Sequence, residues 1–151
     1  MNLPKEIIEL LNGQDLEDKK HLVMMLQSIT AEGYPHTAMV SVGEIVAIDS
    51  DNIRIALWPD TQTAQRLVET GKGSLVIVYA KKIYYIELDL SVLPSLNNEI
   101  YCRLRFEASV KTVKEDNAKY AEIISGISIQ LYDAENVVER WKVTVKELLD
   151  A

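Results

Sequence analysis

Hydrophobic positions in the first third of the chain follow two different patterns. Ile7, Ile8 and Leu11 fall on one face of a helix, which predicts a short helix over residues 4–12. The segments after it are strand-like and are separated by polar or Gly-containing turns. These segments are HLVMMLQSIT (21–30), HTAMVSV (36–42), EIVAI (44–48) and IRIALW (53–58). We therefore expect a meander of three or four short strands.

The middle of the chain changes from helical to strand-like spacing. Ala64, Leu67 and Val68 indicate a helix, and Gly71 can take the left-handed conformation that ends one. Three strands are predicted after it: SLVIVYA (74–80), which is continuously apolar, then KIYYIELDL (82–90) and IYCRLRFEASVKTV (100–113), which alternate and are separated by a turn at SLNNE (95–99). In the last strand we expect Cys102, Leu104, Phe106, Ala108 and Val110 to point inward, and Arg103, Arg105, Glu107 and Lys111 to point outward.

The final third predicts one more helix and one more strand. An apolar stripe with helical spacing runs from Tyr120 to Leu131, and ERWKVTVKELL (139–149) alternates like a strand. Long alternating strands joined by polar turns are typical of an antiparallel barrel. The predicted fold class is therefore α+β: one domain over residues 1–151, with six to eight strands and short helices inserted between them.

Composition and charge narrow the class of protein. The 151 residues suffice for one domain with a real core, and a net charge of −7 argues against nucleic acid, which needs clustered Lys and Arg. No apolar run is long enough for a membrane span, and charges interrupt the N-terminus where a signal peptide needs an apolar block, so we expect a cytoplasmic protein. One cysteine and two histidines leave no recognisable metal site.

The segment WPDTQTAQR (58–66) carries the most specific candidate chemistry. Familiar catalytic and phosphate-binding motifs are missing from the sequence, but here a strand leads directly into a helix. The free N–H groups of a first helical turn attract anions, Thr61 and Thr63 would add hydroxyl donors, and Arg66 would add a cation one turn later. The simpler alternative, and the commoner use of such residues, is that Asp60 or Thr61 only caps the helix.

Other polar residues favour structural interpretations. Glu87 and Asp89 are two apart on a strand and most simply form a solvated face. His36 has no partner that the sequence identifies, so a surface or structural role is favoured. Cys102 fits a small core position, and Trp58 fits the core or a subunit contact, although it also adjoins the helix start and could cover a flat ligand.

Taken in order, VMMLQSITAEGYPHTAMVSV, IRIALWPDTQTAQRLVETGKGSLVIVY and KIYYIELDL resemble the FMN-binding split-barrel family related to pyridoxamine 5′-phosphate oxidase. The resemblance covers roughly residues 20–115 and implies an antiparallel split β-barrel that forms a homodimer with the cofactor sites at the subunit interface. It places the FMN phosphate at Thr61, Gln62, Thr63 and Arg66. The flavin ring would lie along Ala38, Met39, Val40 and Ser41, with Trp58 at the end of the adjacent strand.

Two departures from the family pattern shape the expected function. Many relatives have an Arg-Lys pair where this chain has Gln62-Thr63, and nothing after Asp116 resembles the Arg- and Trp-rich segment that binds substrate in the authentic oxidase. We therefore expect a small FMN-dependent oxidoreductase of unknown substrate, without a side chain assigned to catalysis, and not a vitamin B6 oxidase. A non-catalytic flavin carrier or sensor, or a cofactor-free interaction module, are the alternatives. The sequence does not separate FMN from a deazaflavin or haem.

Overall fold

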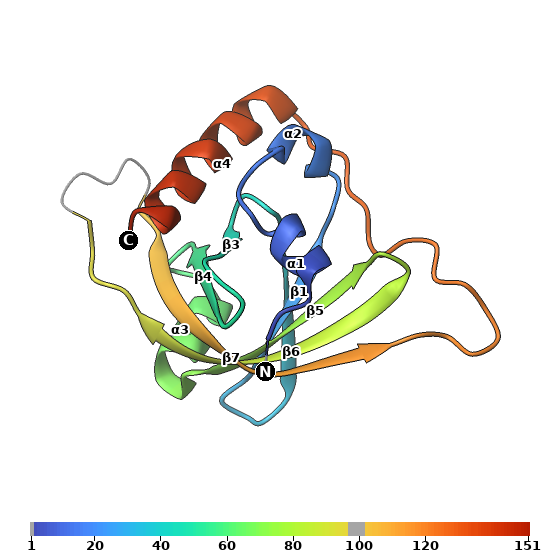
Figure 1. Ribbon diagram of the computed structural model, residues 1–151. Coiled ribbons are helices and arrows are strands. Elements are labelled where there is room, and N and C mark those ends of the chain that lie inside the picture. Colours follow the sequence, from blue (N-terminus) through green and yellow to red (C-terminus); the bar gives the residue numbers. More distant parts are fainter. Residues whose placement is uncertain (1, 97–101) are drawn as a thin grey trace.

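The computed structural model describes residues 2–96 and 102–151, and in this part of the chain seven strands form a single sheet. Neighbouring strands are antiparallel, in the order β2-β1-β5-β6-β7-β4-β3, and the sheet curls into a half barrel (Figure 1). This confirms the predicted antiparallel split barrel of six to eight strands. The strands are β1 (Met24–Ile29), β2 (Pro35–Val40), β3 (Ile45–Ala47), β4 (Asn52–Leu57), β5 (Lys72–Tyr79), β6 (Lys82–Val92) and β7 (Leu104–Asp116).

Four helices accompany these strands in the described residues: α1 (Lys5–Leu10), α2 (Leu16–Lys19), α3 (Gln62–Thr70) and α4 (Ala134–Leu149). The predicted first helix and the helix before Gly71 are both present. Figure 1 shows α1, α2 and α4 gathered on one side of the curled sheet. Ile7 and Leu10 of α1 are buried in the core, and the Tyr84 hydroxyl of β6 donates a hydrogen bond to Glu6 Oε1 at 2.6 Å. None of the described helices has the length and apolar character needed to cross a membrane.

Alternation along β6 separates the core from the outer face of the sheet, as expected. Tyr84, Ile86 and Leu88 are buried, whereas Glu87 is exposed. On β1 the buried residues are Met24, Leu26 and Ser28, so Met25, Gln27 and Ile29 belong to the outer face. The predicted turn at residues 95–99 falls largely on residues 97–101, which lie outside the described part.

The C-terminal segment is a helix, and the predicted strand over residues 139–149 is wrong. Val138, Trp141, Val145 and Leu148 are buried, and their spacing of three and four is that of one helical face. The alternation of Trp141, Val143 and Val145 that suggested a strand covers only five residues of this helix. Gly43 lets α4 approach the sheet closely, because a Cβ atom there would lie 1.9 Å from Trp141 Cγ.

A second prediction, for the start of β7, is also wrong. Arg103 and Arg105 were expected to point into solvent, but both are buried. The Arg103 guanidinium lies over the Trp58 ring after β4, and Arg105 Nη2 donates to Pro94 O after β6, so neighbouring segments cover both side chains. Cys102, expected in the core, is exposed because regular alternation begins only at Leu104.

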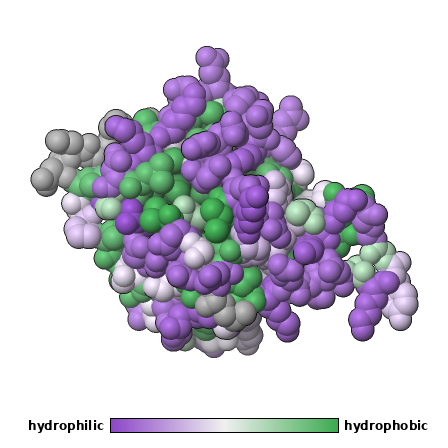
Figure 2. Space-filling model, in the orientation of Figure 1, coloured by the Kyte–Doolittle hydropathy of each residue, from purple (hydrophilic) through white to green (hydrophobic). Residues whose placement is uncertain are grey.

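The predicted helix over residues 120–131 is also wrong. The segment that follows β7 is irregular and projects from the body of the molecule, as the orange loop in Figure 1. Tyr120 and Ile124 are 99% and 88% exposed, and Figure 2 shows apolar and hydrophilic residues mixed on this projection. Leu131 packs against the core and Gly126 lies close to Val78 of β5, but Tyr120 and Ile124 are not buried, and Ser125 and Gly126 are poor helix formers. The chain returns at Ile129, whose N–H donates to His21 O at 3.0 Å.

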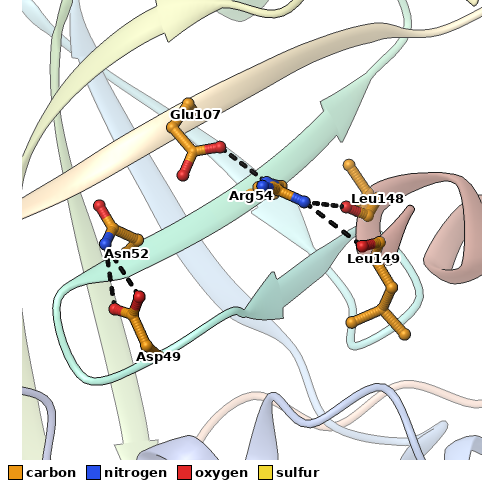
Figure 3. Close-up of polar contacts among 6 residues, drawn as sticks. All are labelled: Asp49, Asn52, Arg54, Glu107, Leu148 and Leu149. Carbon is orange, nitrogen blue, oxygen red and sulfur yellow. Dashed lines mark hydrogen bonds and ion pairs between the residues drawn. The ribbon is translucent and has the colours of Figure 1, made fainter. Parts of the chain in front are cut away.

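Arg54 of β4 fastens the C-terminal end of α4 to the sheet (Figure 3). Its Nε donates to Glu107 Oε2 of β7 at 2.7 Å, and its Nη1 donates to the carbonyl oxygens of Leu148 and Leu149 at 2.8 and 3.4 Å. The last carbonyls of a helix lack intrahelical partners and carry partial negative charge, so a cation placed there is favourable. One side chain thus joins two strands and the helix.

A candidate cofactor site beside helix α3

The two end strands of the sheet, β2 and β3, are joined at one corner by residues 41–44. In this turn the Ser41 N–H donates to Glu44 Oε1 at 3.1 Å. The N–H of Ala56 on β4 donates to Glu44 O at 2.9 Å, which holds β4 against the same turn. The corner therefore brings together the end of β2, with Ser41, and the end of β4, with Trp58. These are two of the predicted cofactor residues, far apart in the sequence.

Helix α3 begins at this corner, and Thr61 is its N-cap. Thr61 Oγ1 accepts a hydrogen bond from the Ala64 N–H at 3.2 Å and donates one to Trp58 O at 2.9 Å. The capping interpretation of Thr61 is therefore correct, and its hydroxyl is occupied. The N–H groups of Gln62 and Thr63 make no hydrogen bond within the described residues. Two amides at the positive end of a nine-residue helix thus remain available.

The side chains at the helix start differ in their access to solvent. Gln62 is exposed, but Thr63 is only 4% exposed and is directed into the core. Arg66, predicted to supply the cation, donates from Nε to Ile29 O at 2.7 Å and pairs with Glu69 through Nη1. The guanidinium therefore ties α3 to the end of β1. The main donors to an anion at the start of α3 would therefore be backbone amides and not the Arg66 side chain.

Strand β2 offers an edge to a flat ligand. It is the last strand in the sheet order, so its backbone groups on the side away from β1 have no strand partner in the described residues. Met39 is 62% exposed, Ala38 is half-buried and Val40 is buried. Helix α3 packs against β1 and β2, so the strand edge and the helix start belong to one region. The assignment of Ala38, Met39, Val40 and the following Ser41 to a flavin ring stays a prediction.

Arg103 is a neighbour of the site that sequence reasoning missed. Its guanidinium carbon lies 3.7 Å from the centroid of the Trp58 ring, in cation–π geometry. Leu57, the last residue of β4, pairs with Leu104, the first residue of β7. Trp58, which follows Leu57, therefore lies opposite Arg103, which precedes Leu104. A long polar side chain three residues before the buried Phe106, with a second at Arg105, was the available signal.

The outer face of the sheet holds a cavity of about 450 Å³. Its wall includes Lys72, Asp89 and Lys111, with Lys72 Nζ 2.8 Å and Lys111 Nζ 3.6 Å from the two Asp89 oxygens. Ile29 and Pro35 form the side nearest β2. Cavities of this volume are common at small-molecule sites. In residues 2–96 and 102–151 no group of three His, Cys, Asp or Glu side chains is arranged to hold a metal ion.

Comparisons with known structures identify the fold class. A candidate pyridoxamine 5′-phosphate oxidase from Lactobacillus delbrueckii matches with a TM-score of 0.59 and 13% identity, over 75% of this chain and 93% of its own. An FMN-binding protein from Syntrophomonas wolfei matches with a TM-score of 0.54 and 17% identity, over 76% of this chain and 88% of its own. At such identities the likeness establishes the fold, and the protein is a split barrel of the kind seen in these proteins.

No protein-family model matches the sequence. The uncharacterized protein YclD of Bacillus subtilis, however, is 42% identical over 142 residues, which is 94% of this chain and 92% of the YclD chain. The protein therefore belongs to the same family as YclD.

Proposed function

We propose that the protein binds FMN, with the cofactor phosphate at the start of α3 and the flavin ring against the edge of β2. The observation that carries the proposal is the pair of unpaired amides at Gln62 and Thr63, at a helix start that shares a corner with the end of β2. A protein of the same fold from Syntrophomonas wolfei is an FMN-binding protein. The residues present fit a phosphate group, because helix-start amides are a general anion site.

The binding energy expected from this arrangement is moderate. A hydrogen bond to a charged group contributes about 1.5 to 3 kcal/mol, and the helix dipole adds about 0.3 to 1 kcal/mol. Two amide bonds with imperfect geometry and the dipole therefore supply on the order of 3 kcal/mol. Family members with an Arg-Lys pair at Gln62-Thr63 would gain more, so we expect this protein to hold FMN less tightly than they do.

Bound flavin supplies hydride and electron transfer, and the protein supplies position and shielding. The β2 edge would orient the ring through backbone hydrogen bonds, while the exposed Met39 and Trp58 side chains would limit the access of water to it. Since the redox step belongs to the cofactor, a catalytic acid or base is not required. The proposed class is thus a small flavin-dependent oxidoreductase, whose substrate is a small molecule of unassigned identity.

We further propose a homodimer in which the outer sheet face of one subunit completes the site of the other. Ile29, Met39 and Tyr85 are 48%, 62% and 38% exposed on this face, and they surround the side of the sheet that carries the cavity. Burial of these side chains would favour association. In sedimentation velocity the protein should behave as a dimer, and Ile29→Asp should shift it to a monomer. A monomeric wild-type protein at micromolar concentration would refute this part of the proposal.

Titration of purified protein with FMN, followed by quenching of flavin fluorescence, tests the site. Gln62→Glu places a negative charge at an exposed position beside the free amides, and we expect it to weaken FMN binding by at least about tenfold. Gln14→Glu makes the same chemical change in the turn between α1 and α2 and should leave the affinity unaltered. Equal affinities of the two variants would exclude the start of α3 as the phosphate site.

Reduction of the bound flavin separates an enzyme from a carrier. Under anaerobic conditions, loss of the oxidised flavin absorption after addition of one equivalent of NADH or NADPH is the result expected for an oxidoreductase. If neither donor reduces bound FMN, the oxidoreductase assignment fails and flavin carriage remains.

A further inference from the structure

Two arginines at the start of β7, Arg103 and Arg105, are buried, and the half-buried Arg140 of α4 lies near Arg103. Arg105 is the second residue of β7 and Arg103 comes just before the strand, so side chains two residues apart project to one side, and the charge of Arg140 on α4 acts on Arg103. The Arg103 side chain is 3% exposed, and Arg105 is 4% exposed as a residue. We call this group the arginine cluster.

The guanidinium groups of the cluster have fewer partners than donors. Arg105 Nη2 donates to Pro94 O, but its Nη1 is buried without a hydrogen bond in the described residues. The same holds for Nε and Nη1 of Arg103 and for Nε of Arg140. Buried hydrogen-bond donors are nearly always paired, and an unpaired one on a charged group is costly. Three of these atoms belong to the neighbouring Arg103 and Arg140, and they indicate that something is needed to complete the cluster.

In the described residues no carboxylate makes a hydrogen bond to the cluster. Glu44 Oε2 lies 3.9 Å from Arg103 Nη1, which is close enough for attraction but too far for a hydrogen bond. Burial raises the pKa of Glu44, although the Ser41 N–H, Arg103 and Arg140 each act to lower it. Burial also lowers the pKa of Arg103, while the charges of Glu44 and Glu147 raise it and that of Arg140 lowers it. Glu107, the next carboxylate along β7, is paired with Arg54.

We propose that the arginine cluster is a binding site for a small oxyanion, the phosphate or carboxylate group of a ligand. Guanidinium groups suit this role because their planar donors match the oxygens of both groups. Trp58 provides the entrance, since one face of its ring covers Arg103 while 40% of the residue is exposed. The cluster adjoins the start of α3, because Arg103 lies over Trp58 and Thr61 Oγ1 donates to Trp58 O, so the test must separate the two sites by substitution.

Thermal unfolding of the purified protein in potassium phosphate, with potassium chloride at equal ionic strength as the reference, tests the proposal. At a large excess of phosphate over its Kd we expect the melting temperature to rise by on the order of 5 °C. The rise should be lost in Arg103→Met and in Arg140→Met, two variants that remove donors while keeping apolar volume. Gln62→Glu, which blocks the start of α3, should keep the full rise. Tryptophan fluorescence should change with phosphate in the wild type and not in Trp58→Phe.

Sodium succinate, used in the same assay, distinguishes a carboxylate ligand from a phosphate ligand. A rise in melting temperature with either anion, lost in Arg103→Met or Arg140→Met, supports the site. The anion that causes the rise shows whether the site takes a phosphate or a carboxylate. If Arg103→Met does not fold, the response of Arg140→Met decides. The proposal is overturned if neither anion stabilises the wild type, if both arginine variants keep the full rise, or if Gln62→Glu alone removes it.

Discussion

Replacement of Arg54 by Met tests how the C-terminal helix is held to the barrel. The Arg54 side chain is 16% exposed and the Glu107 side chain is 29% exposed, so their ion pair is largely shielded from solvent. The change removes this pair together with the hydrogen bonds to the carbonyls of Leu148 and Leu149, while Met keeps much of the apolar packing.

The loss can be estimated from these contacts. A hydrogen bond to a charged group contributes about 1.5 to 3 kcal/mol, and breaking a fully buried ion pair costs about 3 to 5 kcal/mol. Water can still reach Glu107 and the last turn of α4, which reduces the cost. We therefore expect Arg54→Met to lower the free energy of unfolding by about 3 kcal/mol, a large part of the stability of a domain of this size.

Urea denaturation followed by circular dichroism measures this change. Lys142→Met is the matched control, because Lys142 lies on α4 itself and forms only a surface ion pair with Glu139, with its side chain 59% exposed. We expect the control to change stability by less than about 0.5 kcal/mol. If Arg54→Met is no more costly than Lys142→Met, α4 does not dock on β4 and β7 as described.

Three further predictions concern other parts of the fold. Gly43→Ala forces a methyl group against Trp141 and should cost about 1 to 3 kcal/mol in urea denaturation; an unchanged midpoint would mean that α4 packs elsewhere. The Asp51 N–H lowers the pKa of Asp49, so the stabilisation from this carboxylate is present above its ordinary pKa of 3.8 and is lost as the pH falls through the lower folded value. The destabilisation caused by Asp49→Ala at neutral pH should accordingly shrink in acid, and a constant difference would contradict this. Ile124→Ser should alter stability by less than about 0.5 kcal/mol, whereas a cost above about 2 kcal/mol would show that the stripe is core after all.

The barrel could be predicted because its strands carry their own signals. In β6 the buried Ile86 and Leu88 alternate with the exposed Glu87, and polar turns mark the strand ends. Residues 139–149 were harder, because Trp141, Val143 and Val145 satisfy a period of two while Trp141, Val145 and Leu148 satisfy the helical period. Valine and threonine favour strands locally, but packing of the helical face on the sheet decides the outcome.

The candidate site was predictable where it is local and unpredictable where it depends on distant contacts. The helix start after Trp58 and its Thr61 cap follow from neighbouring residues. The attachment of Arg66 to the carbonyl of Ile29 does not, because the two meet only through packing of α3 on β1. The burial of Arg103 likewise depends on a distant contact, with the ring of Trp58.

Comparison of FMN with riboflavin tests the central claim most directly, because the two ligands differ only in the phosphate group. If the free amides of Gln62 and Thr63 hold that phosphate, equilibrium titration by flavin fluorescence should give a Kd for riboflavin about 100-fold higher than that for FMN, which corresponds to about 3 kcal/mol. Equal affinities for the two ligands, or no binding of FMN at all, would contradict the proposed anchoring of a flavin at the start of α3.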